Sequence, residues 1–181
     1  MRRPPPDTPG PLTWPTRIRH ATRRLLRRAK YVTGDRPNLL PIHLRLTPEG
    51  TSRRITDTTD IVIEGFPRSG NTFAVFAVRA AQPHPIEVAS HIHHLAPLEI
   101  AARRRLPLLV VVREPLGCLS SYLVAGPHAR PAGVLAEYIH HHRGVARHRD
   151  NAVIATFDQV TSDLGSVTAR VNERFGTDFA S

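Results

Sequence analysis

The chain has 181 residues, of which 40% are hydrophobic, and this length suits a single domain with a sizeable core. Its formal net charge is +10, but residues 1–54 carry 13 Lys or Arg against 3 Asp or Glu, whereas the rest carries 12 of each kind. The basic excess therefore describes an N-terminal extension and does not indicate a specific nucleic-acid partner. No apolar run approaches the roughly 18 residues of a membrane span, no signal peptide is recognisable, and Cys118 is the only cysteine. These features predict a cytoplasmic protein.

Residues 1–30 are rich in Pro and Arg, and we expect them to be largely disordered, with room for a short basic helix in residues 16–30. This extension is either a solvated tail or a segment that contacts an anionic membrane through residues 16–30. Residues 31–59 are expected to form a connector, in which Ile42–Leu46 alternates well enough for one short strand. The domain that carries the motifs is expected over residues 60–181.

From Ile61 onward, short apolar runs typical of strands alternate with helical patterns. The expected strands are Ile61–Phe66, Ile86–Ser90, Leu108–Val112 and Ala152–Phe157, and the expected helices are Asn71–Gln82, Pro97–Arg105, one beginning at Pro115, Pro131–Arg149 and Gln159–Phe175. The apolar runs do not alternate with polar residues, as is typical of strands covered on both faces. The sequence therefore predicts an α/β fold, with a three-layer, mostly parallel sheet of the P-loop type and helices on both faces. Such a sheet binds its ligands at the carboxyl ends of its strands.

The most informative segment joins the first predicted strand to its helix through a glycine-containing loop. Gly65 and Gly70 have the spacing of a Walker A loop, and Thr72 stands at its Ser/Thr position. The lysine of that motif is replaced by Asn71, and Arg68 is the only cation in the loop. Because a triphosphate needs that lysine, the loop indicates a different anionic nucleotide, and a nucleotide kinase is the less favoured alternative.

A second candidate phosphate site begins at Arg113, directly after the third predicted strand, with Ser121 eight positions further on. An arginine at a strand end can make a bidentate contact with phosphate, and a serine two turns into the next helix can reach the same group. Two alternatives stand beside this interpretation. Arg113 could instead form an ion pair with Glu114 or Glu99. Ser121 could be a residue that only packs between helices, and Ser120 could make the phosphate contact in its place.

Both motifs resemble those of sulfotransferases that use 3′-phosphoadenosine 5′-phosphosulfate (PAPS). Pro67–Phe73 is similar to their 5′-phosphosulfate loop, and Arg113 with Ser121 is similar to their 3′-phosphate site. A weaker match is Val153–Val160, which resembles a strand of the family and the acidic turn that follows it. The resemblance covers roughly residues 60–179 and is that of a short, bacterial-type member.

The resemblance implies transfer of a sulfuryl group from PAPS, as donor substrate and without a metal, to a hydroxyl or amine of an acceptor whose identity stays open. The donor and the acceptor would be the partners. The resemblance also implies that the 5′ end of the donor is held by Arg68, Ser69, Gly70, Asn71, Thr72 and Phe73, and its 3′-phosphate by Arg113 and Ser121. Arg68 would have a catalytic role as well, because it could stabilise the charge that develops on the leaving phosphate.

The catalytic base of the family is a histidine that comes soon after the strand following the P-loop helix. Three candidates occupy this place, His91, His93 and His94, and His91 is preferred because it directly follows the predicted strand. A second histidine run, His140–His142, could suggest a metal site. Because consecutive histidines on a helix point in different directions, we expect a solvated helix face there instead.

Three features depart from the family pattern. Asn71 replaces a hydroxyl residue, and Phe73 stands where tryptophan is common. The sequence also ends at Ser181 without the Arg-x-Gly-like segment that commonly covers the 3′-phosphate in the family. Three explanations stay open: a compact active variant, a truncated gene, or a weakly active or inactive PAPS-binding relic.

Overall fold

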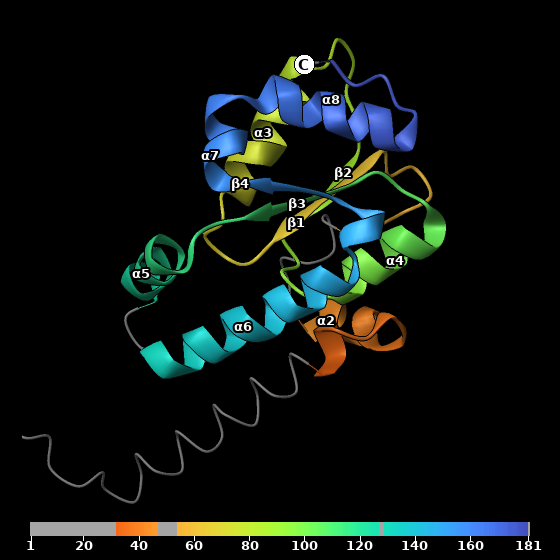
Figure 1. Ribbon diagram of the computed structural model, residues 1–181. Coiled ribbons are helices and arrows are strands. Elements are labelled where there is room, and N and C mark those ends of the chain that lie inside the picture. Colours follow the sequence, from red (N-terminus) through yellow and green to blue (C-terminus); the bar gives the residue numbers. More distant parts are fainter. Residues whose placement is uncertain (1–31, 47–53, 127–128, 181) are drawn as a thin grey trace, which may run out of the picture.

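The computed structural model describes residues 32–46, 54–126 and 129–180. At its centre lies a four-stranded parallel sheet with the strand order β2-β1-β3-β4 (Figure 1). The strands are β1 (Ile61–Gly65), β2 (Val88–Ser90), β3 (Leu108–Val112) and β4 (Val153–Thr156). The predicted α/β fold with a parallel sheet is confirmed. Because every strand runs in the same direction, all four carboxyl ends meet at one edge of the sheet.

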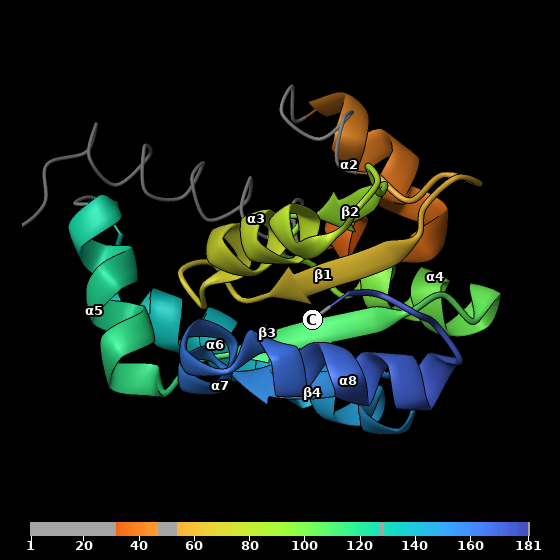
Figure 2. The same cartoon turned by 90° about the horizontal axis from the view of Figure 1, so that it is seen from above.

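Helices cover both faces of this sheet, as predicted (Figure 2). One face is covered by α3 (Asn71–Ala81), α7 (Phe157–Ser162) and α8 (Leu164–Phe175), and the other by α4 (Ala96–Arg104) and α6 (Pro131–Arg147), which is followed by the short 3-10 helix η3 (Arg149–Asn151). Helix α5 (Pro115–Ala125) stands beyond the carboxyl ends of the strands and packs on α6 (Figure 1). Successive strand residues enter opposite layers, so that Ile63 faces α3 and α8 whereas Val62 faces α4. This double coverage explains why the strands are apolar without alternation.

The short strand predicted over Ile42–Leu46 is wrong. Residues 37–46 form the 3-10 helix η1 (Pro37–Leu39) and the helix α2 (Leu40–Leu46). Leu40 and Leu44, four residues apart and therefore on one helix face, are buried against Ile92 and Ala96. The alternating pattern was misleading because the buried residues of this segment, Leu40 and Leu44, repeat with the helical spacing of four. Ile42, which the strand pattern would have buried with Leu44, is exposed.

The single helix predicted over Gln159–Phe175 is wrong: two helices, α7 and α8, occupy this segment, and the first begins two residues earlier than predicted. Helix α7 begins directly at Phe157, because Thr156 and Gln159 form a capping box with each other's backbone N–H groups. Asp163 then ends α7 and caps α8 by accepting a hydrogen bond from the Ser166 N–H.

Two further expectations concern the N-terminal part of the chain. The predicted disordered extension of residues 1–30 and its contact with an anionic membrane lie outside the described residues. In the part that the structure describes, no helix has both the length and the apolar character needed to cross a membrane.

Candidate active site

The loop between β1 and α3 lies at the carboxyl edge of the sheet and has an unusual backbone. Arg68 and Gly70 both adopt left-handed φ values, of 74° and 98°, and the Ser69 N–H donates to the Phe66 carbonyl at 3.1 Å. A Cβ at position 70 would lie 2.7 Å from the Phe157 ring, so both the conformation and the space require glycine there. The turn feeds directly into the N-terminus of α3, which begins at Asn71. Such a helix start presents unpaired N–H groups to an anion.

The first group of predicted site residues, Arg68, Arg113 and Ser121, meets beside this loop. Arg68 Nε donates to Ser121 Oγ at 3.0 Å, and Arg113 Nη1 donates to the Arg68 carbonyl at 3.3 Å. The Arg113 guanidinium also lies over the Phe157 ring, 4.3 Å from its centroid. Two residues that the sequence separates by 45 positions thus bring two positive charges to one edge of the sheet.

The alternative partners of Arg113 are engaged elsewhere. Glu99 accepts from Arg103 in the next turn of α4, and the Glu114 side chain caps α5 by accepting from the Gly117 N–H. Among the described residues, no ion pair includes Arg113. Its charge therefore remains available to an anionic ligand.

The three candidate bases have three different surroundings. His91 Nε2 lies 3.0 Å from Thr72 Oγ1, at the first turn of α3, and its Nδ1 lies 2.7 Å from Ser90 Oγ. His93 Nδ1 lies 2.8 Å from the Gly65 carbonyl, which can only accept, so this nitrogen carries the proton. His94 Nδ1 lies 3.1 Å from Asp35 Oδ1. Both His91 and His93 reach a residue of the predicted donor site, because His93 Nδ1 also lies 3.3 Å from Nδ2 of the buried Asn71.

Asn71, which the resemblance places among the residues that hold the 5′ end of the donor, does not expose its side chain. Its side chain is buried, with Nδ2 donating to the Gly65 carbonyl at 3.2 Å, while Oδ1 has no hydrogen-bond partner. The side chain thus points into the protein, and at this position the backbone N–H is the group suited to an anion. The neighbouring Thr72 and Phe73 are exposed, whereas Ser69 is buried beside Cys118.

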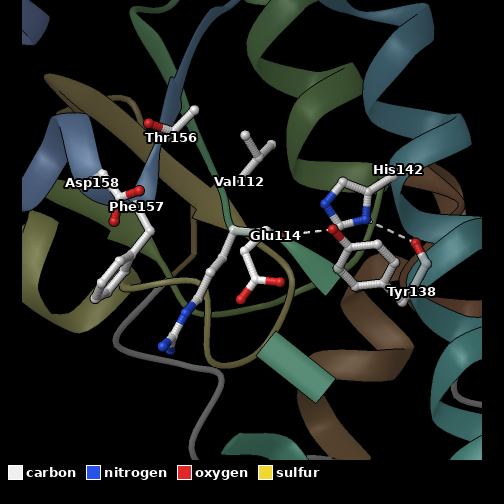
Figure 3. Close-up of a pocket in the computed structure, with 8 residues that line it drawn as sticks. Val112, Glu114, Tyr138, His142, Thr156, Phe157 and Asp158 are labelled. Atoms are coloured by element: carbon white, nitrogen blue, oxygen red, sulfur yellow. Dashed lines mark hydrogen bonds between the residues drawn. The ribbon is translucent and has the colours of Figure 1, made fainter. Parts of the chain in front are cut away.

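A cavity of about 640 Å³ opens at the carboxyl ends of β3 and β4. Its lining residues are Val112, Arg113, Glu114, Tyr138, His142, Thr156, Phe157 and Asp158. Figure 3 shows Tyr138 and His142 on one side of it, opposite Thr156, Phe157 and Asp158. Tyr138 Oη donates to the Arg113 carbonyl at 2.6 Å and so fixes the backbone that carries this arginine. The volume lies within the range of small-ligand sites.

Phe157 is a site residue that the sequence-based prediction missed. It was expected as the last residue of a strand, but it is the first residue of α7 and packs against both Gly70 and Arg113. The available signal was an aromatic residue at the carboxyl end of a parallel strand, where ligands bind.

The solvated face predicted for His140–His142 is wrong for two of the three residues. His141 is buried against Phe66, and burial followed by the nearby His142 lowers the pKa of His141 to about 3. Burial likewise lowers the pKa of His142, whose Nδ1 donates to the Tyr138 carbonyl. His140 is exposed and contacts Asp35 at 2.7 Å. Helix α6 packs on the sheet, and 100° of rotation per residue turns His141 inward.

Across residues 32–46, 54–126 and 129–180, no group of three or more His, Cys, Asp or Glu side chains is arranged to hold a metal ion.

Comparison with known proteins identifies the fold. Neither a protein-family model nor a curated protein matches the sequence. Among solved structures, the mouse sulfotransferase SULT7A1, crystallised as a complex with PAP, is similar with a TM-score of 0.50 and 12% sequence identity. The similarity covers 70% of this chain and 62% of that chain, so this chain spans less than two thirds of the mouse protein. At this identity the likeness establishes a sulfotransferase-like fold.

Proposed function

We propose that this protein transfers a sulfuryl group from PAPS to a hydroxyl or amine of an acceptor. The observation that carries the proposal is the convergence of Arg68, Arg113, Ser121 and His91 at one edge of a sulfotransferase-like sheet. All four are residues that the sequence motifs had predicted for the site. The solved neighbour was crystallised with PAP, which supports the same nucleotide class here.

Each residue of this group has a distinct proposed role. Backbone N–H groups at the start of α3 and the side chains of Arg68 and Thr72 bind the 5′-phosphosulfate of the donor. Arg113 and Ser121 bind its 3′-phosphate, beside the cavity lined by Phe157. When bound, PAPS supplies the sulfuryl group.

His91 is the proposed base. Its Nε2 takes the proton of the acceptor as the acceptor oxygen or nitrogen forms a bond to sulfur. The bond between sulfur and the bridging phosphate oxygen breaks at the same time, and Arg68 stabilises the negative charge left on that phosphate. Thr72 Oγ1 lies 3.0 Å from Nε2 and places the imidazole close to the donor loop, and the acceptor would displace this contact to reach the Nε2 lone pair.

The contact between Arg68 and Ser121 implies a rearrangement on binding. These two side chains are proposed to hold opposite ends of the nucleotide, yet Arg68 Nε donates to Ser121 Oγ at 3.0 Å. Donor binding would therefore exchange this hydrogen bond for contacts with the two phosphate groups. Arg68 is exposed, which leaves its side chain room for such an exchange.

The proposal is tested by binding and turnover measured on the same protein. We expect PAP to bind more tightly than ATP in a calorimetric titration, and labelled sulfate to move from PAPS to one member of an acceptor panel. Arg68→Ala should reduce turnover by roughly 10²- to 10³-fold, as loss of one charge-stabilising donor does. Arg79→Ala, an exposed arginine further along α3, is the matched control and should leave turnover within about twofold.

Three results would contradict the proposal or part of it. Preference for ATP over PAP would indicate a phosphotransferase. PAP binding without turnover on any acceptor would indicate a PAPS-binding relic. Equal turnover of the Arg68→Ala variant and the unmodified protein would remove Arg68 from the catalytic group.

A further inference from the structure

Glu64 is a charged residue inside the hydrophobic core. It lies in β1, where all five residues are buried, and its own exposed fraction is 0%. By the strand period of two it shares a sheet face with Val62, which packs in the apolar layer under α4. A carboxylate in such a place is strongly destabilising unless hydrogen-bond donors satisfy it.

Two of the groups that satisfy this carboxylate belong to the loop of candidate bases. The Ile92 N–H donates to Oε1 at 2.9 Å, and the His93 N–H donates to Oε2 at 3.0 Å. Each carboxylate oxygen thus binds one of two consecutive N–H groups. Hydrogen bonds to a charged acceptor are about twice as strong as neutral ones, so this pair fixes the loop firmly.

The loop needs such support because its backbone is strained. His91 and His93 have left-handed φ values of 62° and 60°, on either side of Ile92. A left-handed non-glycine residue costs on the order of 1–3 kcal/mol and persists only where the surroundings enforce it. Glu64 accepts hydrogen bonds from the N–H of Ile92, which lies between these two residues, and from the N–H of His93, the second of them.

We propose that Glu64 is a positioning residue that holds His91 in its orientation toward the donor loop. Glu64 acts through the backbone N–H groups of Ile92 and His93, the two residues that follow His91. The resulting turn leaves His91 Nε2 at 3.0 Å from Thr72 Oγ1, on the first turn of α3. This inference rests on the proposed function, in which His91 is the base.

Two substitutions separate the charge of Glu64 from its shape. Glu64→Gln keeps the length of the side chain but replaces one acceptor oxygen with an NH₂ donor that faces an N–H, so that one of the two hydrogen bonds is lost. Glu64→Asp keeps the charge but is shorter by one methylene. The control is Val167→Ala, which truncates a buried residue of α8 on the opposite sheet face and lowers stability without touching the loop.

The experiment measures PAP affinity, turnover and the state of His91 in each variant. We expect Glu64→Gln to bind PAP within about twofold of the unmodified protein, while its turnover number falls about tenfold or more with little change in KM. The ¹⁵N resonances of the His91 ring should shift, and the amide protons of Ile92 and His93 should exchange with solvent faster. Glu64→Asp should show a smaller change of the same kind. Val167→Ala should lower the melting temperature and leave the His91 resonances and turnover unchanged.

The two hypotheses fail in different ways. Absence of both PAP binding and turnover in the unmodified protein would overturn the proposed function, whereas the His91 resonances would still report on Glu64. Unchanged His91 resonances in Glu64→Gln would overturn the positioning role. So would a loss of turnover that Val167→Ala reproduces at equal loss of stability, because it would reduce Glu64 to a structural residue.

Discussion

The two halves of the carboxyl edge are built in different ways. In the β1–β2 half, the loops carry three non-glycine residues with a left-handed backbone: Arg68, His91 and His93. The fourth such residue in the described part of the chain, Arg105, lies at the opposite, amino-terminal edge of the sheet. Residues from other elements contact these loops: Glu64 of β1 binds the loop after β2, and Arg113 and Ser121 bind Arg68 in the loop after β1. In the β3–β4 half, each helix start is capped locally, by Glu114 for α5 and by the capping box of α7.

We expect the β1–β2 half to orient the proposed base and the β3–β4 half to bind the nucleotide. A turn that satisfies its own backbone groups is stable alone and offers its outward side chains, such as those of Arg113 and Phe157, as a binding surface. A strained loop held by a buried carboxylate 28 residues away can keep a reactive group in one orientation. We therefore expect substitutions in the β1–β2 half to affect turnover, and substitutions in the β3–β4 half to affect affinity or stability.

The largest expected effect comes from the proposed base, His91. His91→Gln should lower turnover by roughly 10²- to 10⁴-fold and leave PAP affinity nearly unchanged, because general-base catalysis contributes that much to rate. His84→Gln, at an exposed histidine before β2, is the control for a histidine change in itself. Steady-state kinetics with labelled PAPS measure both variants. If His93→Gln lowered turnover while His91→Gln did not, the assignment of the base would move to His93.

The next effect should appear in affinity and not in rate. Arg113→Ala and Ser121→Ala should each weaken PAP binding about 10- to 100-fold, because each removes a hydrogen bond to a charged group. Their affinity for adenosine 5′-monophosphate, which lacks the 3′-phosphate, should change little. Ser120→Ala, at the exposed neighbouring residue, serves as the control. Equal losses for both nucleotides in a calorimetric titration would show that these residues do not bind the 3′-phosphate.

A third effect concerns the packing beneath the β1–β2 half. Burial lowers the pKa of His141 to about 3, below its ordinary value of 6.5, so this residue stays neutral in the folded state while the unfolded chain takes up a proton. The unfolded state binds more protons below pH 6.5, and stability therefore falls as the pH falls from 6.5 toward 3. Between pH 6.5 and 5 the loss should be about 2 kcal/mol, at 1.36 kcal/mol per pH unit.

Urea unfolding at pH 7, 6 and 5 measures this loss. His141→Asn cannot titrate, so its stability should change less with pH than that of the unmodified protein. His142 and His148, whose pKa values are also lowered by burial, contribute equally to both proteins. An identical pH dependence in the two proteins would contradict the assignment to His141.

The smallest effect tests the local character of the β3–β4 half. Thr156→Ala removes the cap of α7 and should lower the free energy of unfolding by about 1 kcal/mol, with turnover unchanged. Thr161→Ala, at an exposed position inside the same helix, should stay within about 0.5 kcal/mol. Denaturant unfolding and kinetics on both variants make this comparison. A fall in turnover with Thr156→Ala would show that this corner is coupled to the reaction.

The sequence by itself determined the features that depend on local rules. Apolar runs of strand length predicted the parallel sheet, because residues buried on both faces must all be apolar. The spacing of Gly65 and Gly70 predicted the loop before α3, since only glycine tolerates the φ of 98° found at position 70. The placement of Arg113 directly after a strand predicted that its side chain would reach the carboxyl edge, near the first loop.

The tertiary structure decided the features that depend on residues far apart in the chain. Ile42–Leu46 became part of a helix because Leu40 and Leu44 found a buried surface at Ile92 and Ala96. Helix α6 turned His141 inward against Phe66, and His140 met Asp35 across 105 positions of sequence. Glu64 found two of its donors, the Ile92 and His93 N–H groups, in the loop that follows β2. No local propensity encodes such contacts, because they form only once the strands and helices have packed.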